Sequence, residues 1–348
     1  MHRSKSPAIL PFHLTFFLLL AALLPAVAPA QDTYTIGLWN VQNFGVTDRF
    51  INDRPVKSAM KPESEIRTMV AILKRLNPDI LGLVEILQDP EDKYVKLMQS
   101  TLKEAGLDYP HLSDCRGEDD RIQTLLLSKF PIVRTEHLTD ATYKATFKDP
   151  KTQVTSEVQR KVERGINQSV IEVRPGLQVR VLLVHLKSKR PFPEIVSDQA
   201  EELGDGFVRR NEALILRGAM TRAVQANPDE RLIAMGDFND TPRSKAVGTI
   251  LGPKSAEIRF YDLWLQDWLG DWWTHFYIPE KSYERLDYMV VSQKLFQDWK
   301  KEKSFVYRHN QTDGPEYNHY NASDHRPLLA TFTVPVEGAE AREPAKKN

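Results

Sequence analysis

The chain of 348 residues has almost no cysteine, since Cys115 is its only one. This excludes a disulfide framework and a zinc site built on paired C-x-x-C motifs. A formal net charge is also absent, because 47 Lys and Arg residues balance 47 Asp and Glu residues. Residues 1–30 contain only two charged side chains, Arg3 and Lys5, so the rest of the chain has 45 basic and 47 acidic side chains. This balance does not favour a broad electrostatic footprint for nucleic acid, although a local basic groove remains compatible with it.

Common catalytic signatures are missing as well. The sequence has no G-x-S-x-G elbow, no H-E-x-x-H zinc-binding helix and no G-x-x-x-x-G-K-[ST] phosphate loop. These absences argue against a serine esterase, a zincin and a P-loop nucleotide hydrolase. Charged residues make up 27% of the chain and aromatic residues 9%, which is ordinary globular usage and excludes global disorder.

The N-terminus has the pattern of a secretory signal peptide over residues 1–30. A basic start precedes an apolar run from Leu14 to Leu24, and Ala28 and Ala30 then supply the small residues that signal peptidase requires. The run is shorter than the ~20 residues that span a bilayer. We therefore expect cleavage after Ala30, export to the periplasm or the medium, and no stable membrane anchor. A retained anchor is the alternative.

Residues 31–335 are expected to form one catalytic domain, followed by a polar tail at 336–348, because no long linker divides them. Short runs rich in Val, Ile and Leu predict buried strands at 35–39, 80–84, 124–127, 179–184, 232–235, 288–291 and 328–332. Apolar periodicity predicts helices at 62–76, from Asp89-Pro90 to Gly106, and at 207–224. Strands mixed with helices predict an α/β or α+β protein in which helices cover sheets.

Polar residues adjoin these predicted strands. Those that directly follow a strand are Asn40, Glu85, His185, Asp237 and Asn239, while Asp287 precedes a strand and Asp324 and His325 precede the last one. Residues at strand ends can converge on one rim of a sheet, where catalytic groups are often carried. Carboxylates and amides without thiolates suit Mg²⁺, Mn²⁺ or Ca²⁺, and histidines with carboxylate partners suit proton transfer. Together they indicate metal-assisted hydrolysis of a phosphate ester.

Six motifs in a fixed order carry a family resemblance: LWNVQNF at 38–44, GLVEI at 82–86, VHLKS at 184–188, GDFNDTP at 236–242, RLDY at 285–288 and SDHRP at 323–327. With these motifs the chain resembles the endonuclease/exonuclease/phosphatase superfamily, whose members include DNase I, exonuclease III, bacterial sphingomyelinases and inositol polyphosphate 5-phosphatases. The resemblance spans nearly all of residues 31–335. It implies an α/β fold, a four-layer α/β sandwich in which helices flank two packed mixed sheets, with the site at one end.

The resemblance also implies a metal site. Glu85 would be the main ligand of a divalent cation, expected to be Mg²⁺ with Mn²⁺ or Ca²⁺ as alternatives. Asn40 would lie by the metal or a phosphate oxygen, and Asp324 would hold the metal or its water. Where the AP-endonuclease branch has an Asp, this chain has Gln42, and where that branch has a Tyr, it has His185. These departures place the chain nearer to the DNase I, sphingomyelinase and phosphatase branches.

The remaining roles implied by the resemblance are catalytic. His325 and Asp287 would form a dyad in which the carboxylate fixes the imidazole tautomer. Asp237 would orient or deprotonate the attacking water, and Asn239 would donate to a non-bridging phosphate oxygen. His185 would contact the phosphate or protonate the leaving oxygen. The choice of general base between Asp237 and His325 stays open.

Two segments bear on the substrate. Lys187, Lys189 and Arg190 would bind flanking phosphates, or else form a solvated basic turn. The segment 263–277 holds four Trp residues, a Phe and a Tyr. We expect these rings to pack in the core, with base stacking or insertion into a lipid interface as alternatives.

The leading hypothesis is a secreted, divalent-metal-dependent phosphoric ester hydrolase, an endonuclease or phosphodiesterase that acts on nucleic acid as a monomer. A second hypothesis keeps the fold and metal but makes the substrate a phospholipid or a phosphomonoester. A third is a catalytically inactive binding protein that reuses the fold. The complete set of acidic, amide and histidine positions favours an enzyme.

Overall fold

The computed structural model describes residues 33–148, 152–189 and 205–334, and two six-stranded mixed sheets form their centre. In spatial order the first sheet comprises β17 (Phe305–Val306), β18 (Leu328–Thr333), β1 (Thr33–Phe44), β4 (Ile80–Leu87), β6 (Ile122–Ser128) and β5 (His111–Cys115). The second comprises β13 (Tyr261–Asp262), β16 (Asp287–Val291), β12 (Leu232–Asp237), β11 (Leu177–His185), β10 (Ile166–Arg174) and β7 (Ile132–Thr135). Each predicted buried strand is confirmed as part of one of these sheets.

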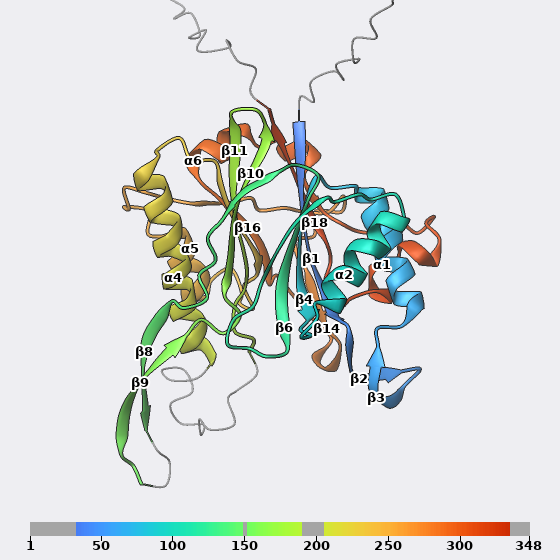
Figure 1. Ribbon diagram of the computed structural model, residues 1–348, viewed down its shortest axis with the longest axis horizontal. Coiled ribbons are helices and arrows are strands. Elements are labelled where there is room, and N and C mark those ends of the chain that lie inside the picture. The colour runs from blue at the N-terminus through green and yellow to red at the C-terminus, as the bar shows by residue number, and fades with distance from the viewer. Residues whose placement is uncertain (1–32, 149–151, 190–204, 335–348) are drawn as a thin grey trace, which may run out of the picture. The chain divides into compact units, whose positions relative to one another are not determined.

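Five α-helices and three hairpins complete the elements considered below. The helices are α1 (Glu63–Leu76), α2 (Lys93–Glu104), α4 (Asp205–Ala226), α5 (Lys245–Leu251) and α6 (Gln293–Asp298). The hairpins are β2 (Val46–Ile51) with β3 (Arg54–Met60), β8 (Thr142–Lys148) with β9 (Thr155–Lys161), and β14 (His275–Tyr277) with β15 (Ser282–Glu284). In Figure 1 the three hairpins all lie at the lower end of the sheets. Among the described residues, no helix combines the length and apolar character needed to cross a membrane.

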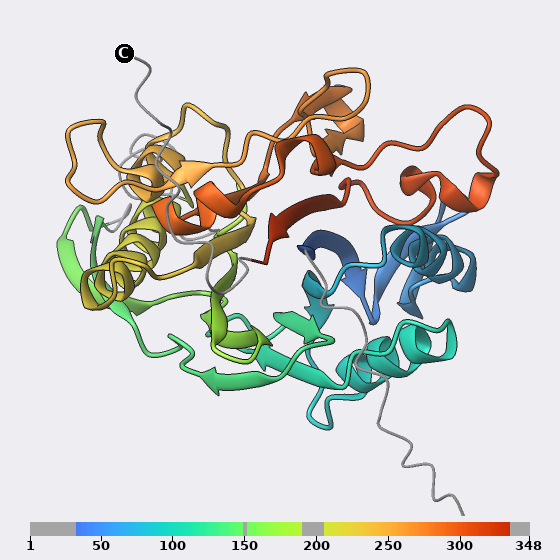
Figure 2. The ribbon, with the colours of Figure 1, turned by 90° about the horizontal axis from the view of Figure 1, so that it is seen from above.

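Three apolar cores define four layers. Alternate residues of the central strands face the other sheet, and Ile36, Val84, Val181 and Met235 meet there. The opposite face of the first sheet packs against α1 and α2, and that of the second packs against α4 and α5. Figure 2 shows these helices on the two outer sides of the paired sheets. The predicted four-layer α/β sandwich is thereby confirmed.

The predicted helices are present, with one boundary corrected. Helix α2 begins at Lys93 rather than at Asp89-Pro90. The Asp89 carboxylate accepts from the backbone N–H of Glu91 at 2.9 Å, so Asp89 and Pro90 form a separate turn before the helix. At the end of α1, Asn77 adopts the left-handed conformation with φ 45° and closes the helix as expected.

Two of the polar residues lie inside strands rather than just after them. Glu85 is the extra residue of a bulge in β4, since Val84 pairs with Thr124 and Ile86 with Gln123. Its φ of 66° is in the left-handed region, which a residue with a long side chain seldom occupies. The register of β1 also shifts after Asn40. Such local strain is frequent at functional sites, where it redirects a side chain.

Gly236 allows strands β11 and β12 to lie close together beside the polar residues. It pairs with Val184 in a parallel register, its φ is 151°, and a Cβ atom built on it would lie 1.8 Å from the carbonyl oxygen of Val184. A side chain at this position would therefore push the two strands apart.

We expect Gly236→Ala to lower the free energy of unfolding by at least about 4 kcal/mol, because the added methyl group overlaps backbone rather than a movable side chain. Gly248→Ala, in α5 where a Cβ would meet no atom within 4 Å, is the matched control and should stabilise by about 0.5–1 kcal/mol. Urea unfolding monitored by circular dichroism measures both. Equal, small effects would contradict the steric argument.

Candidate active site

Three acidic and imidazole side chains lie on neighbouring strands of the second sheet. His185 ends β11, Asp237 ends β12 and Asp287 begins β16, and they are register partners, His185 with Asp237 and Asp237 with Asp287. All three are nearly fully buried, with at most 4% of their surface exposed. The sheet register thus brings together residues that are up to 102 positions apart in the sequence.

Asn40 joins these residues to the first sheet. Its side-chain amide nitrogen donates to Glu85 Oε1 at 3.0 Å and to Asp237 Oδ2 at 3.0 Å, while its Oδ1 accepts from the backbone N–H of Gln42. Glu85 Oε2 accepts from the backbone N–H of Asn43 at 3.0 Å. One buried amide therefore holds two carboxylates that come from different sheets.

The predicted dyad of His325 and Asp287 is present. Nδ1 of His325 lies 2.7 Å from Asp287 Oδ2, and its Nε2 lies 3.8 Å from Asp237 Oδ2. Nε2 of His185 approaches the same Asp237 oxygen at 3.6 Å, so the two imidazoles flank this carboxylate. The backbone of His325 is fixed by Trp39 Nε1, which donates to its carbonyl, and by the Ser323 hydroxyl, which accepts from its N–H.

Burial and neighbouring charges shift the pKa values of these groups in different directions. Burial, together with the charge of Asp287, raises the pKa of Asp237 to about 7. Burial alone would lower the pKa of His325, but the adjacent Asp287 carboxylate outweighs it and raises this pKa well above its usual value. Burial and the charges of Arg164 and His325 hold the pKa of His185 well below its usual value. The site thus combines a cationic imidazole, a neutral imidazole and a carboxyl group that titrates near neutral pH.

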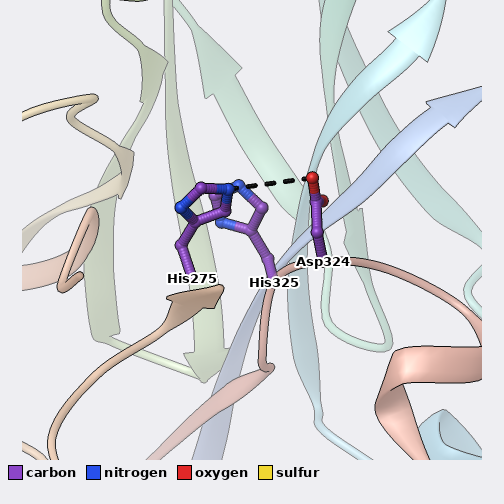
Figure 3. Close-up of side chains that lie close together, drawn as sticks. All are labelled: His275, Asp324 and His325. Carbon is purple, nitrogen blue, oxygen red and sulfur yellow. Dashed lines mark ion pairs between the residues drawn. The ribbon is translucent and has the colours of Figure 1, made fainter. Parts of the chain in front are cut away.

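Asp324 lies next to His275, a histidine that was not among the predicted site residues. His275, on β14, places Nε2 3.7 Å from Asp324 Oδ2, and its ring centroid lies 4.5 Å from that of His325 (Figure 3). Although burial alone would raise it, the pKa of Asp324 is lowered by its contact with His275 and by the charge of His325. No sequence motif includes His275. Its proximity to Asp324 depends on the pairing of backbone segments that are distant in the sequence.

Three groups of described side chains could hold a metal ion, and one of them, Asp237, Asp287 and His325, shares a residue with each of the other two. Glu85, His185 and Asp237 each offer a ligand atom within 4.8 Å of the others, and so do His275, Asp324 and His325. Of the residues predicted to bind metal, Asn40 contacts the Glu85 carboxylate, whereas Asp324 belongs to the second group. The donors of the first group, two carboxylates and an imidazole, fit a divalent cation.

Asn239 and the basic residues after His185 have defined partners. Asn239 has φ 52°, and its amide nitrogen donates to the carbonyl of Leu186 at 2.9 Å. A second N–H of that amide could still serve a phosphate oxygen. Lys187 is buried with its Nζ 3.3 Å from the Ser188 hydroxyl, and exposed Lys189 forms an ion pair of 2.7 Å with Glu284. Arg190 lies outside the described residues.

Glu212 of α4 is a buried residue that sequence reasoning also missed. Its carboxylate accepts from the backbone N–H groups of Glu163 and Lys187, at 2.9 and 2.7 Å. Burial raises the pKa of Glu212 to about 7. It fixes the backbone just after His185 and is a positioning residue rather than part of the site.

The expectation that the aromatic segment packs in the core is wrong for three of its tryptophans. Trp264 and Trp272 are each 41% exposed and Trp268 is 61% exposed, whereas the neighbours of Trp264, Leu263 and Leu265, face the core. Trp273 instead contacts the rings of Tyr283 in β15, His319 and Tyr320. The alternation of exposed and buried positions divides the segment between two environments.

A family model described as "Endonuclease/Exonuclease/phosphatase family" matches residues 37–325. The chain belongs to the endonuclease/exonuclease/phosphatase family. The resemblance read from the six motifs is thereby confirmed. Members of this family are typically metal-dependent hydrolases of phosphoric esters. No curated protein is similar enough in sequence to count as a match.

Solved structures with the same fold have little sequence identity. The human nocturnin catalytic domain with bound sulfate is 16% identical with a TM-score of 0.52, covering 87% of this chain and 95% of that one. A family protein from Bacteroides thetaiotaomicron is 13% identical with a TM-score of 0.52, covering 89% and 98%. The 3′ phosphatase NExo from Neisseria, bound to a product DNA hairpin, is 16% identical with a TM-score of 0.50, covering 86% and 100%. At these identities the likeness shows a shared fold.

We expect Asn40→Asp to lower the free energy of unfolding by about 1–3 kcal/mol without divalent metal, because a third carboxylate replaces the donor between Glu85 and Asp237. Added MgCl₂ should raise the thermal midpoint of this variant more than that of the wild type. Asn167→Asp is the control, since Asn167 is equally buried but hydrogen-bonds to Ser113. If MgCl₂ raised the thermal midpoints of both variants equally, or of neither variant, this explanation would be wrong.

His319 should make the protein sensitive to acid. Burial and the charge of Arg326 lower its pKa to about 2 from 6.5, and neither ring nitrogen has a hydrogen-bond partner among the described residues. Below pH 6.5 the unfolded chain takes up a proton here that the folded chain does not, so stability falls by about 1.4 kcal/mol per pH unit. Between pH 6.5 and 4.5, urea unfolding should show a loss about 2–3 kcal/mol smaller for His319→Phe. An identical loss in both proteins would refute this assignment.

Proposed function

We propose that the protein is a secreted, divalent-metal-dependent phosphodiesterase that cleaves nucleic acid. The observation that carries this proposal is the buried contact of 2.7 Å between His325 and Asp287, which points the other imidazole nitrogen at Asp237 beside Glu85. The family's typical chemistry, metal-dependent hydrolysis of phosphoric esters, agrees with this arrangement. An inactive binding protein would have no use for this buried and costly set of charges.

Glu85, with Asn40 beside it and His185 and Asp237 within reach, is the proposed position of Mg²⁺, or of Mn²⁺ or Ca²⁺. A cation bound there would neutralise phosphate charge and offset the repulsion between the buried carboxylates. Asn239 is proposed to donate its second amide N–H to a non-bridging phosphate oxygen, where charge builds up in the transition state.

Proton transfer is assigned to the groups around Asp237. A carboxyl group with a pKa of about 7 can accept the proton of an attacking water at neutral pH. The cationic His325 is placed to stabilise the charge of the attacked phosphate, and Asp287 holds its orientation. The neutral His185, on the other side of the carboxylate, can contact the phosphate as a hydrogen-bond donor.

The β2–β3 hairpin supports nucleic acid as the substrate. It follows β1, in which the backbone N–H of Asn43 donates to Glu85. Phe50 is 78% exposed on it, and the exposed Arg54 pairs with the next residue, Ile51. The exposed ring suits stacking on a base, and the exposed cation of the same hairpin suits contact with a phosphate. The NExo structure, which holds a product DNA hairpin, is a precedent for this substrate on the same fold.

The β14–β15 hairpin favours a second candidate, a phospholipid phosphodiesterase. Tyr277, Ile278 and Tyr283 are 44%, 69% and 54% exposed at its tip and sides, next to His275. Exposed aromatic and aliphatic side chains of this kind can enter a lipid interface. A phosphomonoesterase of the same fold is a third possibility that the site chemistry allows.

Secretion and a monomeric state belong to the same proposal. The support for secretion is the N-terminal pattern of basic start, apolar run and small residues up to Ala30. Cleavage would give a chain that starts at Gln31.

The decisive experiment incubates protein recovered from the culture medium or periplasm with supercoiled plasmid, bis-p-nitrophenyl phosphate or sphingomyelin vesicles, each with Mg²⁺ or with EDTA. We expect plasmid nicking that requires Mg²⁺ and falls by about 10²–10³-fold in His325→Ala, the range for loss of one group that stabilises transition-state charge. His111→Ala, a half-buried histidine of β5, is the control and should keep full activity.

Each result assigns the substrate differently. An intact plasmid with hydrolysis of the small diester would discard the nuclease and keep the site. Cleavage of sphingomyelin alone would establish the second candidate. If His325→Ala kept full activity, the assignment of the active site would be wrong.

A further inference from the structure

Arg49 is a partly buried cation of β2 that the proposed reaction does not use. Its Nη2 donates to the carbonyl oxygens of Asn43 and Gly45, the latter at 2.7 Å. Its Nε donates to the carbonyl oxygen of Ala59 in β3 at 3.2 Å. One guanidinium group therefore ties the end of β1 to the β2–β3 hairpin that follows it.

The segment that this guanidinium holds is a bulge in β1. The register of β1 shifts between Asn40 and Phe44, so that three residues of this strand lie opposite Glu85 alone in β4. Two of them, Gln42 and Asn43, have φ values of 49° and 56°, in the left-handed region that residues other than glycine seldom occupy. Backbone groups that a bulge takes out of the ladder need other hydrogen-bond partners.

Two cations supply those partners to the carbonyl groups of the bulge. Besides Arg49, the side chain of Lys61, a residue only 2% exposed, donates from Nζ to the carbonyl oxygen of Gln42 at 3.3 Å. The backbone N–H of Lys61 also donates to the carbonyl oxygen of Gly45 at 3.1 Å. Lys61 thus holds the peptide group before Asn43, and Arg49 holds the peptide group after it.

The other side of the bulge faces the Glu85 carboxylate. The C=O and N–H of a trans peptide point in opposite directions, so the contact of Lys61 with the carbonyl of Gln42 directs the N–H of Asn43 away from Lys61. This N–H donates to Oε2 of Glu85 at 3.0 Å. A group that hydrogen-bonds a metal ligand sets its orientation and thereby the affinity for the ion.

We infer that Arg49 is a positioning residue for the metal ligand Glu85, on which it acts by fixing the backbone of Asn43. The inference rests on the proposed function in one respect, because it takes Glu85 as the position of the divalent ion. It assigns a role in metal binding to the β2–β3 hairpin, the same element that is proposed to contact nucleic acid.

The direction of the effect separates this role from that of a nearby charge. Burial lowers the pKa of Arg49, and the negative charges of Glu65 and Glu85 oppose this change, so its charge is felt at the site. A positive charge repels a metal ion, and its removal by itself would raise the affinity. Loss of the hydrogen bonds that hold Asn43 would lower it instead.

Titration of the full chain with Mn²⁺, with the free ion measured by electron paramagnetic resonance, gives the affinity without any hydrolysis. We expect Arg49→Met to weaken Mn²⁺ binding by about tenfold, the lower end of the range for loss of a group that orients a metal ligand. Arg49→Lys keeps the charge with fewer directed donors and should weaken binding less. Lys57→Met is the matched control, because it removes an exposed cation from the same hairpin, and should leave the affinity unchanged.

Hydrogen–deuterium exchange of the metal-free protein reports on the bulge itself. Exchange in the segment around Asn43 should be faster in Arg49→Met than in the wild type, and unaltered in Lys57→Met. Thermal unfolding checks that each variant is folded. If Arg49→Met does not fold, Arg49→Lys carries the test, and affinity and exchange equal to those of the wild type would overturn the inference.

Two results with folded Arg49→Met would also overturn it: an Mn²⁺ affinity that is unchanged or raised, or unaltered exchange around Asn43. The proposed function fails separately. Weakened Mn²⁺ binding by Arg49→Met, together with a wild type that hydrolyses no phosphoric ester, would refute the proposed function and leave the role of Arg49 standing.

Discussion

The side-chain amide of Asn40 is the contact on which the arrangement of the site depends. It lies fully buried between the Glu85 and Asp237 carboxylates, which belong to different sheets, and donates to both at 3.0 Å. Without these two N–H donors, the carboxylates would face one another in a medium of low dielectric constant, where their repulsion is strong. The amide therefore links the two sheets at their polar end, as the apolar core links them elsewhere.

Around this contact the fold keeps several groups in unfavourable states. Asp237 is buried next to Asp287, Glu85 has a left-handed backbone, and His185 has a buried nitrogen for which the described part of the chain offers no hydrogen-bond partner. Each of these costs free energy that the close-packed sheets must offset. They are concentrated at one end of the strands, where a bound cation and a phosphate would relieve part of the cost. This is the usual compromise between stability and function.

Sequence reasoning reached the strands because buried strands are local patterns, and it reached the layers and the Asp287–His325 pair through the family resemblance that the six motifs carry. It did not reach the bulge at Glu85, since a left-handed glutamate follows from pairing with β6 and not from its neighbours in the sequence. It also did not reach His275, whose proximity to Asp324 depends on a bridge between segments 50 residues apart. The exposed tryptophans were misjudged because hydrophobicity alone does not say which rings the second sheet covers.

The pairing of β1 with β18 has a consequence for when the protein can first act. These are the first and last described strands, with Thr33 opposite Thr333, and Ser323 donates to the carbonyl of Asn40 at 2.7 Å. A chain still emerging from the ribosome or a translocation pore lacks the segment that carries Asp324 and His325. Because contacts between distant segments form late in folding, the site stays incomplete until this segment has been made and has paired with β1. The topology thus delays any hydrolytic activity until β18 is in place.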